Sequence, residues 1–133
     1  MVAINFSPQF AGPVERREKR QTIRRKARIR PGQRAQLYTG QRTKACRKLA
    51  EDDPVCVEVL PVRITRGTLE VDGACLMSDT AAAFARADGF KDFNAMADWF
   101  AEKYGGPVFE GYVIKWDWPA KLSNSDTRGS DND

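Results

Sequence analysis

Lys19, Thr22 and Arg24 place an amine, a hydroxyl and a guanidinium within six consecutive residues of the chain. The sequence contains no histidine, which excludes Ser-His-Asp catalysis, Cys-His catalysis and imidazole metal sites. A threonine nucleophile then needs another base, and a lysine that desolvation and nearby cations keep neutral is the available kind. A carboxyl group such as that of Asp88 would protonate the leaving amine. The alternative is a binding site, in which Lys19 contacts a phosphate, Thr22 bonds to a backbone amide and Asp88 ends a helix.

Thr22 and Arg24 must be positioned by residues 21–25, which we expect to be extended. Side chains two residues apart in an extended segment lie on the same face, so Arg24 should line a pocket beside Thr22 and contact a phosphate or a base carbonyl there. The alternation of residues 3–7 predicts a preceding strand, and Pro8 suits the first turn of a short helix that runs toward Lys19.

The remaining pattern predicts an α+β domain with about six strands, one early helix and a late helical pair. Further strands are expected at residues 34–39, 45–49, 54–64, 68–71 and 109–116. Pro61 places the longest of them at a sheet edge or at a bulge. The late helices are expected to begin at the N-caps Ser78 and Asp92 and to end at Gly89 and Gly105. Because the strands follow one another without helical crossovers, we predict an antiparallel, barrel-like sheet.

Residues 16–48 contain fourteen of the twenty-two Lys and Arg residues and a single acid, Glu18, so this segment has a charge of +13 and the remainder −9. Such a charge asymmetry is typical of proteins that bind a polyanion. Ile23, Ile29 and Leu37 interrupt the cations as residues that can be buried, which favours a folded surface over a disordered basic arm. Besides Arg24, the expected nucleic-acid contacts are Arg20, Arg25, Arg42, Lys44, Arg47 and Lys48. For the last four of these, a solvated surface without a ligand is an equal alternative.

The chain of 133 residues predicts one domain, residues 1–118, followed by a tail, residues 119–133, that is rich in Ser, Asn, Asp and Gly and is expected to be disordered. No apolar run approaches the roughly 20 residues of a membrane span and the N-terminus lacks a secretion signal, so we expect a cytoplasmic protein without a membrane partner.

Cys46, Cys56 and Cys75 form no C-x-x-C pair, so we expect reduced, buried thiols and neither a metal nor another cofactor. The oligomeric state stays open.

Several motifs occur in an order that is similar to that of a known family: Ile4-Asn5-Phe6 before a helix, Lys19-x-x-Thr22-Ile23-Arg24 after it, Pro31-Gly32 before Leu37-Tyr38, Phe84 to Phe90 at a helix end, and Phe109-x-Gly111-Tyr112-x-Ile114 as the last strand. Through these motifs residues 3–118 resemble the ASCH domain family of PUA-like β-barrels, and Lys-x-x-Thr-Ile-Arg is the most specific of them. The stretch from Tyr38 to Lys48 is similar to small members encoded by phages and prophages.

This resemblance implies a basic cleft beside the early helix, with Phe6 and Tyr38 as its pocket aromatics. The function it implies first is the binding of nucleic acid, RNA more than DNA, or of a modified nucleotide or nucleoside. A bacterial subgroup implies an alternative, the hydrolysis of N4-acetylcytidine by a Lys, a Thr and a Glu. These three correspond to Lys19, Thr22 and Asp88, the last being one methylene shorter than the Glu. A ribonuclease that needs no metal ion is a further alternative.

Overall fold

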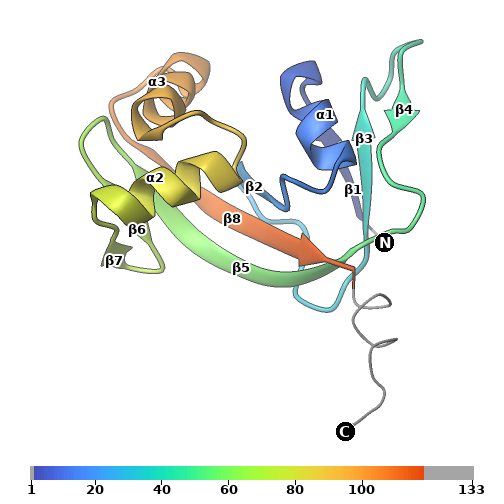
Figure 1. Ribbon diagram of the computed structural model, residues 1–133, viewed down its shortest axis with the longest axis horizontal. Helices are drawn as coiled ribbons and strands as arrows, with labels where there is room; N and C mark the ends of the chain where they lie inside the picture. The colour runs from blue at the N-terminus through green and yellow to red at the C-terminus, as the bar shows by residue number, and fades with distance from the viewer. Residues whose placement is uncertain (1, 119–133) are drawn as a thin grey trace, which may run out of the picture.

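The strands form two sheets in the computed structural model, which describes residues 2–118 (Figure 1). One sheet has the order β1-β3-β4, with β1 at Val2–Phe6, β3 at Ala35–Thr39 and β4 at Arg47–Lys48. The other has the order β2-β8-β5-β6-β7, formed by β2 (Gln21–Arg24), β8 (Phe109–Asp117), β5 (Val55–Ile64), β6 (Leu69–Val71) and β7 (Ala74–Cys75). The helices are α1 (Pro8–Glu15), α2 (Ser78–Ala87) and α3 (Phe93–Tyr104), and the predicted α+β class is confirmed.

The predicted antiparallel barrel differs from this arrangement in strand direction, strand number and closure. β1 pairs with β3 in parallel, because α1 and β2 lie between them in the chain and return it in the same direction. Eight strands form within the described part of the chain, since the Asp72-Gly73 turn leads into the additional short strand β7. The strands of residues 2–118 belong to two sheets and not to one closed barrel.

The two sheets are joined by main-chain hydrogen bonds between the start of β3 and the start of β5. Cys56 N donates to Gln33 O at 2.8 Å, and Ala35 N donates to Pro54 O at 2.9 Å. The edge strands β1 and β2 are connected by a side chain instead, since Arg24 Nη2 donates to Asn5 O at 2.8 Å. Figure 1 shows α2 and α3 at one end of the long strands β5 and β8, and α1 with β1 and β3 at the other end.

Pro61 lies inside the second sheet and not at an edge, because β5 is paired with both β8 and β6. The ladder between β5 and β6 ends at the pair Val62–Val71. Pro61 therefore lies opposite the turn between β6 and β7, where no ladder hydrogen bond needs its absent N–H, and Asp72 N of that turn donates to Pro61 O at 2.8 Å. β5 does carry a bulge, as the second alternative predicts, but the register shift lies between Cys56 and Glu58 and not at Pro61.

The two late helices place the acid of the candidate site. Asp92 caps α3 as expected, since its Oδ1 accepts a hydrogen bond from Ala95 N at 2.8 Å. Ser78 is the first residue of α2 and not its N-cap, which is Met77. After α2, Gly89 has a φ of 100°, a left-handed conformation that suits glycine, and this turn leaves the preceding Asp88 inside the protein.

The basic segment is part of the folded domain, as its apolar residues predict. Ile23, Ile29 and Leu37 all belong to the hydrophobic core.

Cys56 is buried as expected, whereas Cys46 and Cys75 are exposed. Cys46 directly precedes the short strand β4, and Cys75 belongs to the short strand β7, and both strands lie at the surface. Within residues 2–118 no helix is long and apolar enough to cross a membrane. The tail predicted at residues 119–133 lies outside the described residues.

Candidate functional site

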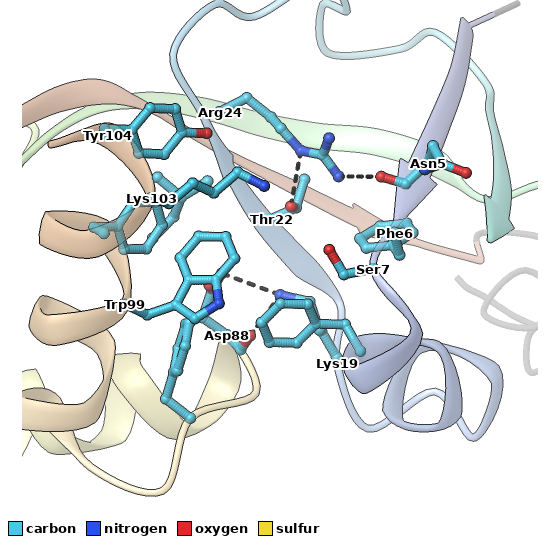
Figure 2. Close-up of a pocket in the computed structure, with 14 residues that line it drawn as sticks. Asn5, Phe6, Ser7, Lys19, Thr22, Arg24, Asp88, Trp99, Lys103 and Tyr104 are labelled. Atoms are coloured by element: carbon cyan, nitrogen blue, oxygen red, sulfur yellow. Dashed lines mark hydrogen bonds and ion pairs between the residues drawn. The ribbon is translucent and has the colours of Figure 1, made fainter. Parts of the chain in front are cut away.

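A cavity of about 210 Å³ lies where α1, β1 and β2 face α3 and the turn after α2 (Figure 2). The cavity brings together the three residues predicted to do chemistry, Lys19, Thr22 and Asp88, and surrounds them with aromatic rings from α1 and α3. Typical sites for drug-sized ligands have volumes of about 300–1,000 Å³, so this smaller cavity has room for a ligand the size of one nucleobase.

Lys19 and Asp88 form a buried ion pair at the base of the cavity. The two side chains are 2% and 4% exposed, and Lys19 Nζ lies 3.3 Å from Asp88 Oδ1. Lys19 Nζ also donates to the main-chain oxygen of Asp88 at 2.5 Å, and Gln21 Nε2 donates to Asp88 Oδ1 at 3.3 Å. The shorter acid at position 88 therefore reaches the lysine directly.

Burial acts on both members of this pair in the direction of their neutral forms. Desolvation lowers the pKa of Lys19 below its ordinary value, although the neighbouring Asp88 carboxylate opposes this shift. Desolvation likewise raises the pKa of Asp88, and the Lys19 ammonium opposes that shift. Transfer of the proton from Lys19 therefore costs less free energy here than in water, which is the property that a lysine base requires.

Thr22 and Arg24 lie on the same face of β2 and both line the cavity, as the alternation predicts. Arg24 Nε donates to Thr22 Oγ1 at 3.1 Å, so the threonine hydrogen remains free for another acceptor. Burial lowers the pKa of Arg24, but a guanidinium stays charged in proteins. A negative charge that develops on Thr22 Oγ1 would therefore face a fixed cation.

The expected pocket aromatics divide between two locations. Phe6 lines the cavity, packs edge-on against Trp116 with a centroid distance of 5.8 Å, and lies 5.3 Å from the guanidinium carbon of Arg24. Tyr38 is not among the residues of the cavity wall, because its neighbours Leu37 and Thr39 occupy the buried face of β3 and alternation turns Tyr38 to the other face.

Three of the six expected surface cations are held by acids from outside the basic segment. Arg20 pairs with Asp117 at 3.1 Å, Arg47 with Glu15 at 2.6 Å and Lys48 with Asp53 at 3.0 Å. The other three make no ion pair within residues 2–118: Arg25 lies 5.4 Å from the Tyr104 ring centroid, and Arg42 and Lys44 are exposed in the loop between β3 and β4. The expected nucleic-acid surface is therefore not one continuous row of free cations.

Five residues of the cavity wall, Asn5, Ser7, Trp99, Lys103 and Tyr104, carry polar groups that sequence reasoning did not place there. The spacing of Trp99 and Tyr104 in α3 is typical of core residues, but both are only partly buried and turn toward the cavity, beside Lys103. Asn5 reaches the cavity as the residue before Phe6, and Ser7 as the residue that begins α1. The Ser7 side chain makes no capping hydrogen bond, so its hydroxyl is free at the cavity wall.

The one local signal for Ser7 was its position before Pro8 at a helix start, where serine is a common N-cap.

Comparison of the chain with protein-family models, with curated protein sequences and with solved structures gives no significant match.

Proposed function

We propose that this protein is a small amidohydrolase that removes the acyl group from an N-acylated nucleobase or nucleoside such as N4-acetylcytidine. The observation that supports this function is the buried Lys19–Asp88 ion pair, which borders the same small cavity as the Thr22 hydroxyl. Buried ion pairs seldom improve stability over apolar residues of similar size, so a pair at a cavity wall indicates a functional role.

The fold that we propose for it is a PUA-like β-barrel that is open between β1 and β2. Support comes from the main-chain hydrogen bonds between β3 and β5, which connect the two sheets, and from the Arg24–Asn5 contact between their edge strands. The order of motifs that resembles the ASCH domain family is consistent with this architecture.

In the proposed reaction, Lys19 first releases its proton to solvent, and the neutral amine then accepts the Thr22 proton while Thr22 Oγ1 attacks the acyl carbon. The Arg24 guanidinium stabilises the negative charge that forms on Thr22 Oγ1 as its proton leaves, and this charge passes to the acyl oxygen when the new C–O bond forms. When the C–N bond breaks, the Lys19 ammonium returns the proton to the leaving amine, and water then hydrolyses the threonine ester to release the carboxylic acid. The contact of Asp88 with Lys19 Nζ supports a positioning role for Asp88 in place of direct protonation of the amine.

The test is the release of cytidine from N4-acetylcytidine by the purified protein. We expect Thr22→Ala to abolish turnover and Thr22→Ser to retain part of it, since serine keeps the hydroxyl. Ser7→Ala is the matched control, because Ser7 presents the other aliphatic hydroxyl of the cavity wall, and it should stay active. Turnover that survives in Thr22→Ala but disappears in Ser7→Ala would assign the nucleophile to Ser7 and refute this mechanism.

A second candidate function, recognition of RNA without chemistry, is favoured by the charge of the basic segment. Only five of its fourteen cations, Arg16, Lys19, Arg20, Arg47 and Lys48, form ion pairs within residues 2–118. If the parent protein hydrolyses no acylated nucleoside while Lys19→Ala and Arg24→Ala each weaken RNA binding by about 1–3 kcal/mol, the site is a recognition site. The metal-independent ribonuclease stays a prediction without further support.

A further inference from the structure

A second groove, of about 280 Å³, continues from the cavity along the opening between β1 and the segment that follows β2. The two spaces share Asn5 and Arg24, which are connected by the hydrogen bond from Arg24 Nη2 to Asn5 O. Arg24 therefore stands at the junction, with Nε directed to Thr22 in the cavity and with the same side chain forming part of the groove wall.

This groove is positively charged without compensation. Lys26 and Arg28 line it together with Arg24, and none of its lining residues is an Asp or a Glu. Neither Lys26 nor Arg28 makes an ion pair within residues 2–118, and both are exposed. Their remaining neighbours in the groove are residues of β1 and the side chains of Ile29, Gln41 and Ile114.

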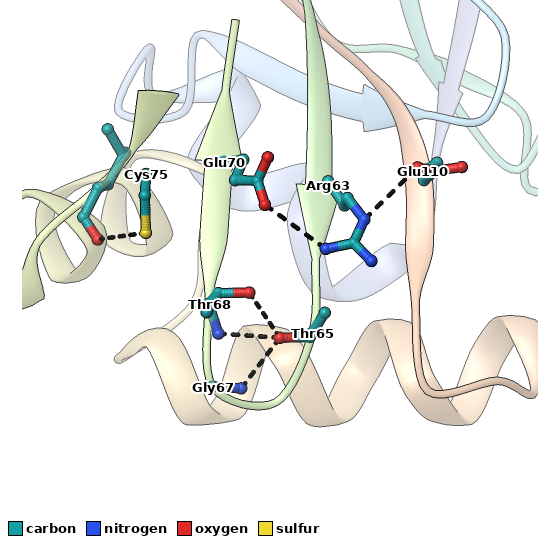
Figure 3. A network of polar contacts seen from close by, with 8 residues as sticks. Arg63, Thr65, Gly67, Thr68, Glu70, Cys75 and Glu110 are labelled. Atoms are coloured by element: carbon teal, nitrogen blue, oxygen red, sulfur yellow. Dashed lines mark hydrogen bonds and ion pairs between the residues drawn. The ribbon is translucent and has the colours of Figure 1, made fainter. Parts of the chain in front are cut away.

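A groove lined by residues of β5, β6 and β8 provides a contrast within the same molecule. It is lined by Arg25 and Arg63, but Glu70 of β6 and Glu110 of β8 each lie 3.5 Å from the Arg63 guanidinium and neutralise it (Figure 3). An anion would approach carboxylates there, whereas in the groove beside β1 it would meet only cations, amides and apolar side chains.

We propose that the groove beside β1 is a phosphate subsite, so that the ligand of the cavity is a nucleotide and not a free nucleoside. The base would occupy the cavity, and its phosphate would lie against Arg24, Lys26 and Arg28, where charge-assisted hydrogen bonds are strongest. This inference rests on the proposed nucleobase specificity of the cavity. The phosphate is a monoester in a mononucleotide and a diester in a single strand, and both present the same anionic oxygens.

The experiment compares three probes on the Thr22→Ala background, which keeps the ligands intact: N4-acetylcytidine, its 5′-monophosphate, and a short single-stranded RNA with one internal N4-acetylcytidine. By calorimetry at low salt, we expect the monophosphate to bind at least about tenfold tighter than the nucleoside. Tighter binding of the RNA than of the monophosphate identifies the diester strand as the source of the phosphate, and equal binding identifies the mononucleotide.

The double variant Lys26→Ala/Arg28→Ala should reduce the nucleotide-to-nucleoside affinity ratio to within about threefold of unity. Arg86→Ala/Lys91→Ala is the charge-matched control, because it also removes two exposed cations that form no ion pair within residues 2–118 and do not line the groove, and it should leave that ratio unchanged. An equal loss in both double variants would show a general charge effect and overturn the subsite.

Failure of the subsite and failure of the proposed hydrolysis give different results. If the parent protein hydrolyses N4-acetylcytidine but binds nucleoside and nucleotide equally, the subsite is refuted and the enzyme stands. If the parent hydrolyses nothing but the ratio depends on Lys26 and Arg28, the subsite stands and the cavity is a recognition site. Absence of binding by all three probes would refute both.

Discussion

Among residues 2–118, the Lys19 ammonium and the Asp88 carboxylate are the two charged groups that are almost completely removed from water. Each loses its hydration, and their mutual attraction compensates only part of that loss. The desolvation therefore dominates the pKa of both, lowering that of Lys19 and raising that of Asp88. At the scale of single residues, the site combines an amine whose pKa burial lowers with a hydroxyl in the same cavity that accepts a hydrogen bond from a guanidinium.

A prediction at this scale concerns the pH dependence of Asp88→Asn. Loss of the carboxylate leaves the ammonium of Lys19 buried without a counterion, so the free energy of unfolding should fall by about 3–5 kcal/mol at neutral pH. The lysine pKa in the folded variant then lies further below its ordinary value of 10.5, because the opposing attraction is gone. At pH values between the lysine pKa of the folded variant and that of the unfolded chain, the unfolded chain binds more protons than the folded one. The free energy of unfolding therefore rises with pH in this range, by up to about 1.4 kcal/mol per pH unit.

Urea unfolding of Asp88→Asn from neutral pH to near the ordinary lysine pKa measures this slope. The double variant Lys19→Met/Asp88→Asn is the control, since it has no buried amine and should lose the additional slope and regain stability. If the unfolding free energies of Asp88→Asn and of the double variant run parallel with pH, Lys19 is not desolvated as described.

At the scale of elements, the position of β2 against β8 decides whether Thr22 and Arg24 reach the cavity. β2 pairs only with β8 in its sheet, in a register that sets Thr22 opposite Ile114 and Arg24 opposite Tyr112. The neighbouring residue Gly111 allows this close approach, because a Cβ atom there would lie 2.4 Å from the main-chain oxygen of Arg24 and 2.8 Å from the Phe109 ring.

We therefore predict that Gly111→Ala displaces β2 and impairs the site. A main-chain oxygen cannot move aside as a flexible side chain does, so the substitution should cost at least about 1–3 kcal/mol of stability and lower hydrolysis or ligand binding. Gly106→Ala is the matched control, because the nearest atom to its Cβ is 3.9 Å away. Thermal unfolding and turnover of the two variants measure both effects, and equal behaviour of the two would contradict the close approach.

At the scale of the whole molecule, Trp118 holds three distant segments together at the end of β8. Its indole Nε1 donates to Asp52 O in the connection between β4 and β5 at 2.7 Å. The Arg17 guanidinium carbon, from the connection between α1 and β2, lies 4.0 Å from the centroid of its ring. Trp118 is 4% exposed, so these contacts replace solvent on most of the ring.

The corresponding prediction is a graded loss of stability. Trp118→Ala should lower the free energy of unfolding by about 3–5 kcal/mol, because it leaves a cavity between the three segments. Trp118→Phe keeps an aromatic ring but leaves Asp52 O without its donor, so about 1–2 kcal/mol should be lost. Denaturant unfolding measures both, and a loss in Trp118→Ala no larger than that in Trp118→Phe would mean that the ring contributes little beyond the hydrogen bond.

Charge compensation is also a property of the whole molecule. The acids Glu15, Asp53, Asp88 and Asp117 lie outside residues 16–48, and each pairs with a cation of that segment. The uncompensated cations that share a groove with the site are Lys26 and Arg28, which sequence reasoning did not select. Counting charges along the chain therefore predicted a basic protein surface but not where an anion meets free cations.

The sequence by itself determined the local structure of the site. The shared face of Thr22 and Arg24 followed from the alternation of an extended chain, and the end of α2 at Gly89 and the cap of α3 at Asp92 followed from residue types at helix termini. These features depend on backbone geometry within a few residues, so they are written in short stretches of sequence. The parallel pairing of β1 with β3 has no such local signature.

Only the tertiary structure decided which distant residues meet. Lys19 and Asp88 are 69 positions apart, and sequence reasoning placed them in one candidate site without predicting their ion pair. The turn of Trp99 and Tyr104 toward the cavity, the exclusion of Tyr38 and the neutralisation of Arg47 by Glu15 depend on how the helices pack on the two sheets. Such contacts are set by burial and by long-range pairing over the whole chain, and no periodicity within a single segment specifies them.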